Sequence, residues 1–266
     1  MKAQSSGKIA LEMMFKEYRW ITILVLTVSS LLMILSPFIP VVAVLILYAY
    51  VFSKAHRRFM ENFAKENNLT YASKADIGSV TGRLFSKGHS KHISNIVSGL
   101  YKEHPFRLFN YRYTVGSGKN SHTYKFTVYE IVFEKTKFPH ILLHSKTMWS
   151  RYGSIDMWGS DKDIRVSLEE PFNEYFNLYV TQDYEIEALQ IFTSSVLDFL
   201  KNEAHKFSIE FADNRVYIYD NLLIHTKSEL DQMYSVARKI FDAVGGISDR
   251  LYDDFEVLYS VYKAEK

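Results

Sequence analysis

An uncharged, strongly apolar run from Trp20 to Ser53 constrains this chain more than any other feature. A membrane-spanning helix needs about 17–25 predominantly apolar residues, so the run can supply two short ones. Residues 36–40 (SPFIP) lie in its middle, and two prolines so close together break a helix and favour a turn. The sequence therefore predicts a transmembrane helical hairpin over residues 19–53. The alternative is one long, kinked span, which would overshoot the hydrocarbon core unless it tilted strongly.

Basic residues flank this run on both sides. Lysine and arginine near the ends of membrane spans prefer the cytoplasmic side, and both flanks reach that side only with an even number of spans. The sequence thus predicts an integral protein of the plasma membrane with both termini in the cytoplasm and the lipid bilayer as one partner. The flanking residues are Lys2, Lys8, Lys16 and Arg19 before the run, and Lys54, Arg57, Arg58 and Lys65 after it.

The remaining composition is that of an ordinary folded domain. Hydrophobic residues make up 47% of the 266 residues and aromatic residues 15%, which is enough for a sizeable core. The chain has no cysteine, which excludes disulfides, thiol catalysis and cysteine metal sites. The net charge is only +2 and no long basic run occurs, so nucleic acid is not an expected partner.

The sequence divides into four parts: a leader over residues 1–18, the hairpin over residues 19–53, a stalk helix over residues 54–68 and a domain over residues 69–266. The leader has a modest apolar face, which fits an amphipathic helix on the membrane or a disordered arm equally well. Phe59 and Phe63 stand four apart on one face of the stalk, and Asn67-Asn68 can end that helix.

Strands and helices are partly segregated within the domain. Segments rich in Tyr, Phe, Thr and Val predict strands, and residues 116–120 (GSGKN) have the chemistry of a hairpin turn. Asp183 predicts one helix start, and the capping-box pair Thr226 and Glu229 predicts another. This order favours an α+β fold with an antiparallel sheet and packed amphipathic helices. The predicted strands are residues 106–115, 122–134, 138–145, 164–168, 176–180, 207–211 and 216–219, and the predicted helices are residues 183–201, residues 226–244 and a last one after Ser248/Asp249.

The sequence assigns no catalytic, cofactor-binding or metal-ligating residue, and it implies no cofactor. Residues 116–119 (GSGK) lack the other residues of a phosphate loop. His140 and His144 share one face of a predicted strand but stand about 13 Å apart, too far for one metal ion. His89 and His92 lie in a Gly-, Ser- and Lys-rich segment without a nearby acid, which is typical of exposed loop histidines.

Three aspartates, Asp156, Asp161 and Asp163, form an acidic patch near Trp149 and Trp158. Paired carboxylates can serve acid–base chemistry or hold a cation. Their spacing matches no calcium loop, because no glycine falls at the turn position. A solvated loop is the simpler interpretation of this patch.

Several segments resemble uncharacterised bacterial membrane-anchored proteins. They are the paired apolar helices, the segment FRLFNYRYTVGSGK…TYKFTVYEIVF and the element IEF…NRVYIYD before the last helices. The likeness spans most of the domain and consists of aromatic and turn patterning. It implies a bacterial inner-membrane location and gives no site residues, because that family has no assigned chemistry.

These observations favour a membrane-anchored, non-enzymatic interaction or scaffold module. Its domain would face the cytoplasm and hold a protein partner, or a second copy of the chain, at the membrane. One alternative is an enzyme acting on a lipid or envelope precursor, with Asp156, Asp161, His140 and His144 as its candidate residues. The other alternative is a lipid- or small-ligand-binding domain with an aromatic-lined cavity.

Overall fold

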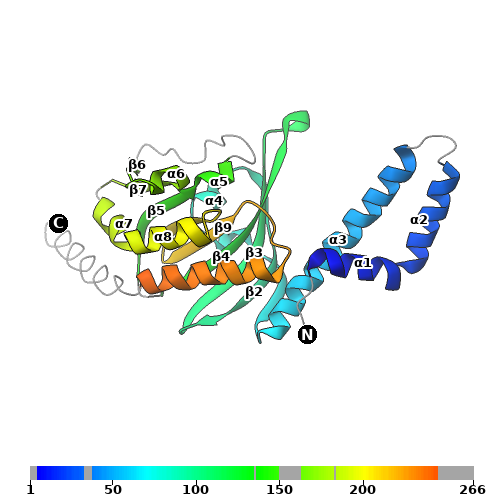
Figure 1. The fold of residues 1–266 in the computed structure, drawn as a ribbon, viewed down its shortest axis with the longest axis horizontal. Helices are drawn as coiled ribbons and strands as arrows, with labels where there is room; N and C mark the ends of the chain where they lie inside the picture. The colour runs from blue at the N-terminus through cyan, green and yellow to red at the C-terminus, as the bar shows by residue number, and fades with distance from the viewer. Residues whose placement is uncertain (1–4, 33–37, 135, 150–162, 183, 245–266) are drawn as a thin grey trace.

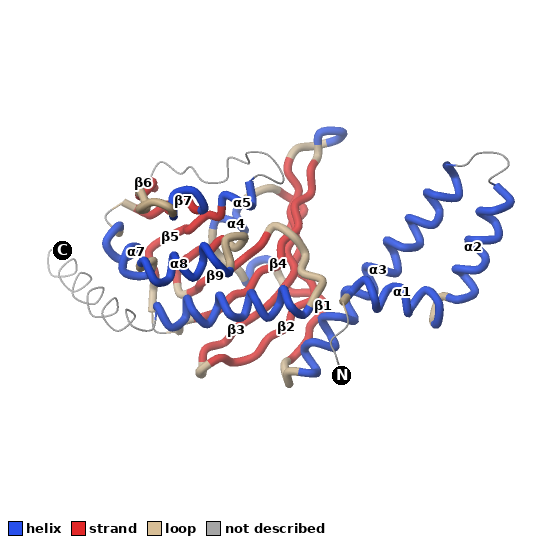
Figure 2. Tube along the Cα trace, viewed as in Figure 1, coloured by secondary structure: helices blue, strands red, loops and turns tan. Residues whose placement is uncertain are grey.

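The computed structural model describes residues 5–32, 38–134, 136–149, 163–182 and 184–244. Figure 1 shows two parts, a helical arm formed by the first three helices and a body built on one large sheet. In Figure 2 the same division is visible by element type, with helices lying across the strands of the body. The arm projects from one side of the body.

The arm consists of α1 (Ser6–Lys16), α2 (Arg19–Leu32) and α3 (Phe38–Glu66). The Ser5 hydroxyl caps α1 by accepting a hydrogen bond from the Lys8 amide at 3.4 Å. Thr22 Oγ1 donates to Met14 O at 3.1 Å and so ties α2 to α1. The leader is therefore helical over residues 6–16, and it packs on α2 and α3.

α3 continues without a break from the arm into the body. Its second half buries Phe59 and Phe63 in the main core, together with the buried face of α1. The helix ends at Glu66, and Asn68 follows with a positive φ of 55°. Asparagine tolerates this left-handed conformation, so the predicted helix end at Asn67-Asn68 is confirmed.

The arm does not form the predicted transmembrane hairpin. Among the described residues, no helix combines the length and apolar character that crossing a bilayer demands. α2 has 14 residues, which at about 1.5 Å per residue cover about 21 Å of a hydrocarbon core about 30 Å thick. α3 is longer but becomes charged from Lys54 onward. The predictions of membrane spans over residues 19–53, of an integral inner-membrane protein and of two cytoplasmic termini are therefore wrong.

Within the described residues, the body forms a nine-stranded sheet in the order β1-β2-β3-β4-β9-β8-β5-β7-β6. All neighbouring strands in this sheet run antiparallel. The α+β class with an antiparallel sheet is therefore confirmed. The strands are β1 (Thr70–Ala75), β2 (His89–Tyr101), β3 (His104–Val115), β4 (His122–Val132), β5 (Phe138–Ser145), β6 (Asp163–Val166), β7 (Phe176–Thr181), β8 (Ser208–Asp213) and β9 (Arg215–Asp220).

β3 and β4 form the long hairpin that the sequence predicts. Phe106 pairs with Ile131 at one end and Val115 with His122 at the other. Gly116 begins the turn with a φ of +77°, and a Cβ there would lie 2.4 Å from the Asn120 carbonyl oxygen. Only glycine fits this position, so the GSGK segment is a hairpin turn.

Helices cover one face of the sheet and enclose the main core with α1 and α3. They are α7 (Glu185–Ile191), α8 (Ser194–Glu203) and the helix of residues 227–244, while the short helices α5 (Lys146–Trp149) and α6 (Phe172–Tyr175) lie beside β5 and β7. The single helix predicted over residues 183–201 is two helices. Phe192 leaves the helical conformation at ψ 59°, and Thr193 then takes the extended backbone conformation of the N-cap position before α8.

A second core lies on the opposite face, beneath η1 (Ile77–Ser79) and α4 (Arg83–Ser86). Tyr111, Tyr113 and Tyr217 are fully buried there, as expected for sheet tyrosines. The Glu130 carboxylate, whose side chain is fully buried, pairs with both Arg107 and Arg215.

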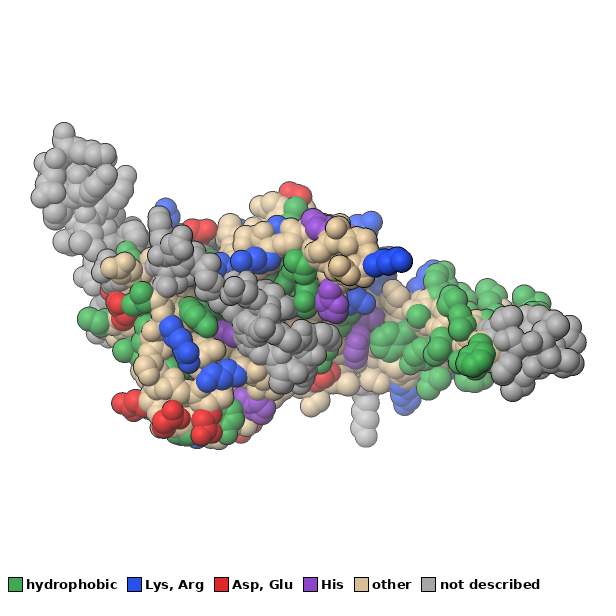
Figure 3. All heavy atoms as spheres, turned by 90° about the horizontal axis from the view of Figure 1, so that it is seen from above, with side chains coloured by type: hydrophobic (Ala, Val, Ile, Leu, Met, Phe, Trp, Pro, Cys, Tyr) green, Lys and Arg blue, Asp and Glu red, His purple; other side chains and the backbone are tan. Residues whose placement is uncertain are grey.

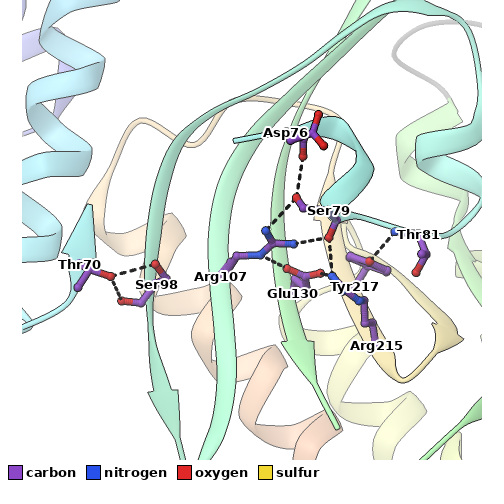
Figure 4. Close-up of polar contacts among 9 residues, drawn as sticks. All are labelled: Thr70, Asp76, Ser79, Thr81, Ser98, Arg107, Glu130, Arg215 and Tyr217. Carbon is purple, nitrogen blue, oxygen red and sulfur yellow. Dashed lines mark hydrogen bonds and ion pairs between the residues drawn. The ribbon is translucent and has the colours of Figure 1, made fainter. Parts of the chain in front are cut away.

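These two arginines hold the covering segment onto the sheet (Figure 4). Both donate to the Ser79 carbonyl oxygen, Arg107 at 3.0 Å and Arg215 at 2.7 Å. Arg107 also donates to Ser79 Oγ at 3.1 Å, and the Thr81 amide donates to the Tyr217 hydroxyl at 3.1 Å. Every charge in this network is paired, which indicates a structural role.

The helix of residues 227–244 begins as the sequence predicts. The Thr226 amide donates to Glu229 Oε2 at 3.2 Å, and the Glu229 amide donates to Thr226 Oγ1 at 3.3 Å. This reciprocal pair is the predicted capping box. Asp183, Gly245-Gly246 and the helix predicted after Ser248/Asp249 lie outside the described residues, and the division of the chain into four parts stays a prediction.

Candidate functional site: a polar pocket beside an apolar arm

A pocket opens where the arm meets the body, between α3 and residues 221–229. Its volume is about 830 Å³, within the range of about 300–1,000 Å³ that small-molecule sites occupy. The helix-covered face of β2, β3 and β4 forms its floor. Figure 3 shows histidine and basic side chains on the body close to the arm.

Thr127 of β4 fixes one wall of this pocket. Its amide and its hydroxyl both donate to the Leu222 carbonyl oxygen, at 3.1 and 3.0 Å, and the hydroxyl accepts from the Ile224 amide at 2.8 Å. The Thr226/Glu229 capping box follows directly. Residues 222–229 are therefore held over the sheet by hydrogen bonds at both ends.

Four segments that are far apart in sequence meet at His56 in the pocket wall. Asn110 Nδ2 of β3 donates to His56 Nε2 at 2.6 Å. Ser6 Oγ of α1 and His225 Nδ1 each lie 3.2 Å from His56 Nδ1. Because an amide nitrogen only donates, a neutral His56 carries its proton on Nδ1, where Ser6 or His225 can accept it.

Burial keeps these histidines neutral. It lowers the pKa of His56 to about 4, and the neighbouring His225 adds to this effect. Burial also lowers the pKa of His225; Glu229 opposes the shift and Lys125 adds to it. The cluster therefore acts through hydrogen bonds and carries no charge at neutral pH.

A cationic row crosses the pocket floor. Arg112 of β3 pairs in register with His92 of β2 on one side and Lys125 of β4 on the other. The pKa of His92 is lowered, mainly by burial and to a smaller extent by the positive charges of Arg112 and Lys74. Among the described residues, no carboxylate forms an ion pair with Arg112 or Lys125. Like charges directly opposite each other destabilise a sheet, so an anion bound here would stabilise it.

Glu229 also lines the pocket, but its carboxylate is already engaged. It accepts hydrogen bonds from the Thr226 hydroxyl at 2.8 Å and from the amides of His225 and Thr226 at 3.3 and 3.2 Å. Although burial opposes the shift, these hydrogen bonds lower the pKa of Glu229. Glu229 therefore stays ionised, and the two cations Arg112 and Lys125 outnumber this one carboxylate in the pocket lining.

The arm carries the second unusual surface, because α2 and the first half of α3 turn apolar side chains outward. Thr22 and Ser29 of α2 are buried within the arm at 5% and 6% exposure, whereas Trp20 and Leu24 are 77% and 63% exposed. On α3, Ile46 is 65% exposed. A surface helix in water normally buries its apolar side chains and exposes its polar ones. Figure 3 shows these apolar side chains gathered along the arm.

The histidines of the predicted enzyme alternative lie away from this pocket. His140 Nε2 lies 3.0 Å from Glu210 Oε1, and His144 Nδ1 lies 3.2 Å from Ser208 Oγ. Both belong to β5, and burial lowers the pKa of His144 to about 3. Asp156, Asp161 and Trp158 lie outside the described residues, and Asp163 begins β6.

His89 and His92 belong to a strand and not to a loop, so their interpretation as loop histidines is wrong. His89 Nε2 lies 2.8 Å from the Gly116 carbonyl oxygen at the hairpin turn, and His92 lines the pocket. His92 is the pocket residue that sequence reasoning singled out. The sequence also contains a signal for two other pocket residues, Arg112 and Lys125. Alternation along the hairpin places them opposite each other on one face.

The architecture defines an α+β protein with a large antiparallel sheet and an N-terminal helical arm. A scan against models of protein families finds no match, and a search of curated proteins finds none. The fold is similar to the crystal structure of the mycobacterial trehalose monomycolate transport factor A, TtfA, with a TM-score of 0.53 and 11% sequence identity. The alignment covers 71% of this chain and 93% of the TtfA chain in that crystal structure. At this identity the likeness concerns the fold alone.

Proposed function

We propose that this chain is a non-enzymatic interaction module, in which the outward face of the arm binds the arm of a second copy. The observation that supports this proposal is the reversed polarity of α2. Its hydroxyl-bearing residues Thr22 and Ser29 face into the arm, and its large apolar residues face out. Such a face is stable in water only when another apolar surface covers it.

The exposed apolar area is large enough for a stable dimer. Large side chains carry about 150–250 Å² each, so the half-exposed ones of the arm present on the order of 1,000 Å². A standard interface takes about 800 Å² from each partner, and a typical monomer exposes no contiguous apolar patch above about 600 Å². The exposed side chains are Trp20, Ile21, Ile23, Leu24, Leu26, Val28, Phe38, Val41, Val42, Leu45, Ile46, Tyr48 and Tyr50.

Charge also favours a second copy as the occupant. Residues 20–53 contain no charged side chain, so two identical arms meet without repulsion. At the base of the arm, Arg58 pairs with Glu17 and Arg57 with Glu61 at 2.8 Å, which neutralises charge at the edge of the contact. A two-fold arrangement of two helical pairs would give a four-helix bundle, the usual way to bury such faces.

The test is the mass of the full chain in solution, measured by light scattering over a concentration series. The wild type is expected at twice the 31.1 kDa of one chain. Ile46→Glu should weaken association by at least about 100-fold, since an unpaired buried charge costs several kcal/mol. Ile186→Glu is the matched control, because Ile186 is 70% exposed on α7, away from the arm.

Two results with the wild-type chain would overturn the proposal. One is a wild-type chain that stays monomeric at every concentration. The other is a monomer that binds phosphatidylcholine vesicles through the arm, since the apolar face would then be covered by lipid and not by a second copy. Equal association of the wild type and Ile46→Glu would also contradict it.

A further inference from the structure

The pocket beside the arm carries positively charged side chains that have no part in the proposed self-association. Arg112 and Lys125 lie directly opposite each other on its floor, flanked by His92, and the Glu229 carboxylate is engaged by its helix cap. Arg112 and Lys125 are exposed to the pocket opening. Two adjacent cations that lack a protein partner among the described residues suit a compact dianion better than a single carboxylate.

The buried part of the pocket adds a second recognition element. Asn110 is 5% exposed, its Nδ2 is engaged with His56, and its Oδ1 has no hydrogen-bond partner in the part of the chain that the structure describes. A buried acceptor without a donor costs about 1–3 kcal/mol, and a hydroxyl group on a ligand could satisfy it. Phe52 and Leu222 supply apolar contacts for a carbon backbone between the two polar ends.

We propose that this pocket binds a phosphate monoester that carries a free hydroxyl group. Arg112 and Lys125 bind the phosphate oxygens, and the Asn110 side chain accepts a hydrogen bond from the ligand hydroxyl. The cavity of about 830 Å³ accommodates a molecule of this size. The same chemistry occurs in a soluble sugar or polyol phosphate and in the headgroup of lysophosphatidic acid.

Calorimetric titration of the full chain with glycerol 3-phosphate tests the proposal. Arg112→Gln and Lys125→Gln should each weaken binding by about 10- to 100-fold, the usual effect of losing a charge-assisted hydrogen bond. Lys119→Gln is the control, because Lys119 lies in the turn of the same hairpin and does not line the pocket. Ile46→Glu should bind as the wild type does, which separates this site from self-association through the arm.

The source of the phosphate is resolved by a parallel titration with phosphatidylcholine vesicles containing lysophosphatidic acid. Binding of glycerol 3-phosphate identifies a soluble ester, and binding of the vesicles alone identifies a lipid headgroup, provided that Arg112→Gln weakens that binding to the extent given above. Inorganic phosphate should bind more weakly than glycerol 3-phosphate, because it lacks the carbon-borne hydroxyl. The proposal is overturned if neither ligand binds, if inorganic phosphate binds as tightly, or if Lys119→Gln weakens binding as much as Arg112→Gln.

Discussion

Glu130 shows how a single residue holds two layers of the body together. Its buried carboxylate pairs with Arg107 and Arg215, which in turn hold Ser79 of the covering segment. Glu130→Gln leaves two partly buried cations without a counter-charge, so the free energy of unfolding should fall by about 3–5 kcal/mol. Guanidinium denaturation measures this loss. Glu134→Gln, at an exposed position beyond the end of β4, should change stability by less than about 0.5 kcal/mol.

The buried histidines predict how stability depends on pH. The pKa of His56 is lowered to about 4 and that of His144 to about 3, from an ordinary value near 6.5. Below about pH 6.5 these histidines bind protons in the unfolded chain but stay neutral in the folded chain. Stability therefore falls as the pH falls. By about pH 4.5 the loss is about 2–3 kcal/mol for each histidine.

Denaturation of the wild type and His144→Asn at several pH values checks this expectation. The variant should lose stability less steeply on acidification, whatever its stability at pH 7, because one of the neutral buried histidines is gone. His89→Asn, at an exposed histidine, serves as the control. Identical pH slopes for His144→Asn and the wild type would contradict the assignment of His144 as buried and neutral.

Among the helices and strands, the helix of residues 227–244 has the clearest local source of stability, which is its N-terminal cap. Thr226 Oγ1 both donates to Glu229 Oε2 at 2.8 Å and accepts from the Glu229 amide. Thr226→Ala should lower the free energy of unfolding by about 1 kcal/mol, the usual cost of losing a cap. Ser228→Ala removes an exposed hydroxyl two residues later and should have little effect. A loss in Ser228→Ala equal to that in Thr226→Ala would contradict the role of the cap.

Elements that local chemistry specifies could be predicted from the sequence. The β3–β4 hairpin, β5 and the Thr226 cap follow from strand-forming residues, turn glycines and a capping box, and all are found. The split between α7 and α8 was missed, because their apolar residues keep one helical period across Phe192. The apolar run misled the prediction because it is divided between α2, which has 14 residues, and the first part of α3, which becomes charged from Lys54 onward.

The pocket was beyond sequence reasoning for a different reason. Ser6, His56, Asn110 and His225 come from four separate segments, and they meet only when α1 and α3 pack on the sheet. No spacing rule connects residues 50 or more positions apart. The pairing of Arg112 with Lys125 lay within reach, because the hairpin register follows from the turn.

At the scale of the whole molecule, the arm determines how the body would be presented to a partner. It projects from one side of the sheet (Figure 1). The phosphate pocket proposed above opens at its base. Two copies joined through their arms would therefore carry two pockets beside one shared bundle. In such a dimer the outward faces of the two arms meet.

Spin labelling tests whether the two arms meet, since the chain has no cysteine and one introduced cysteine carries one label. Val42→Cys lies on the arm at 53% exposure, and Leu100→Cys lies at 70% exposure at the far end of β2. Packed helices have axes about 8–10 Å apart, so labels at position 42 should broaden each other's spectra, and dilution with unlabelled chain should remove the broadening. Labels at position 100 should show none. A sharp spectrum at position 42, or equal broadening at both positions, would contradict the account.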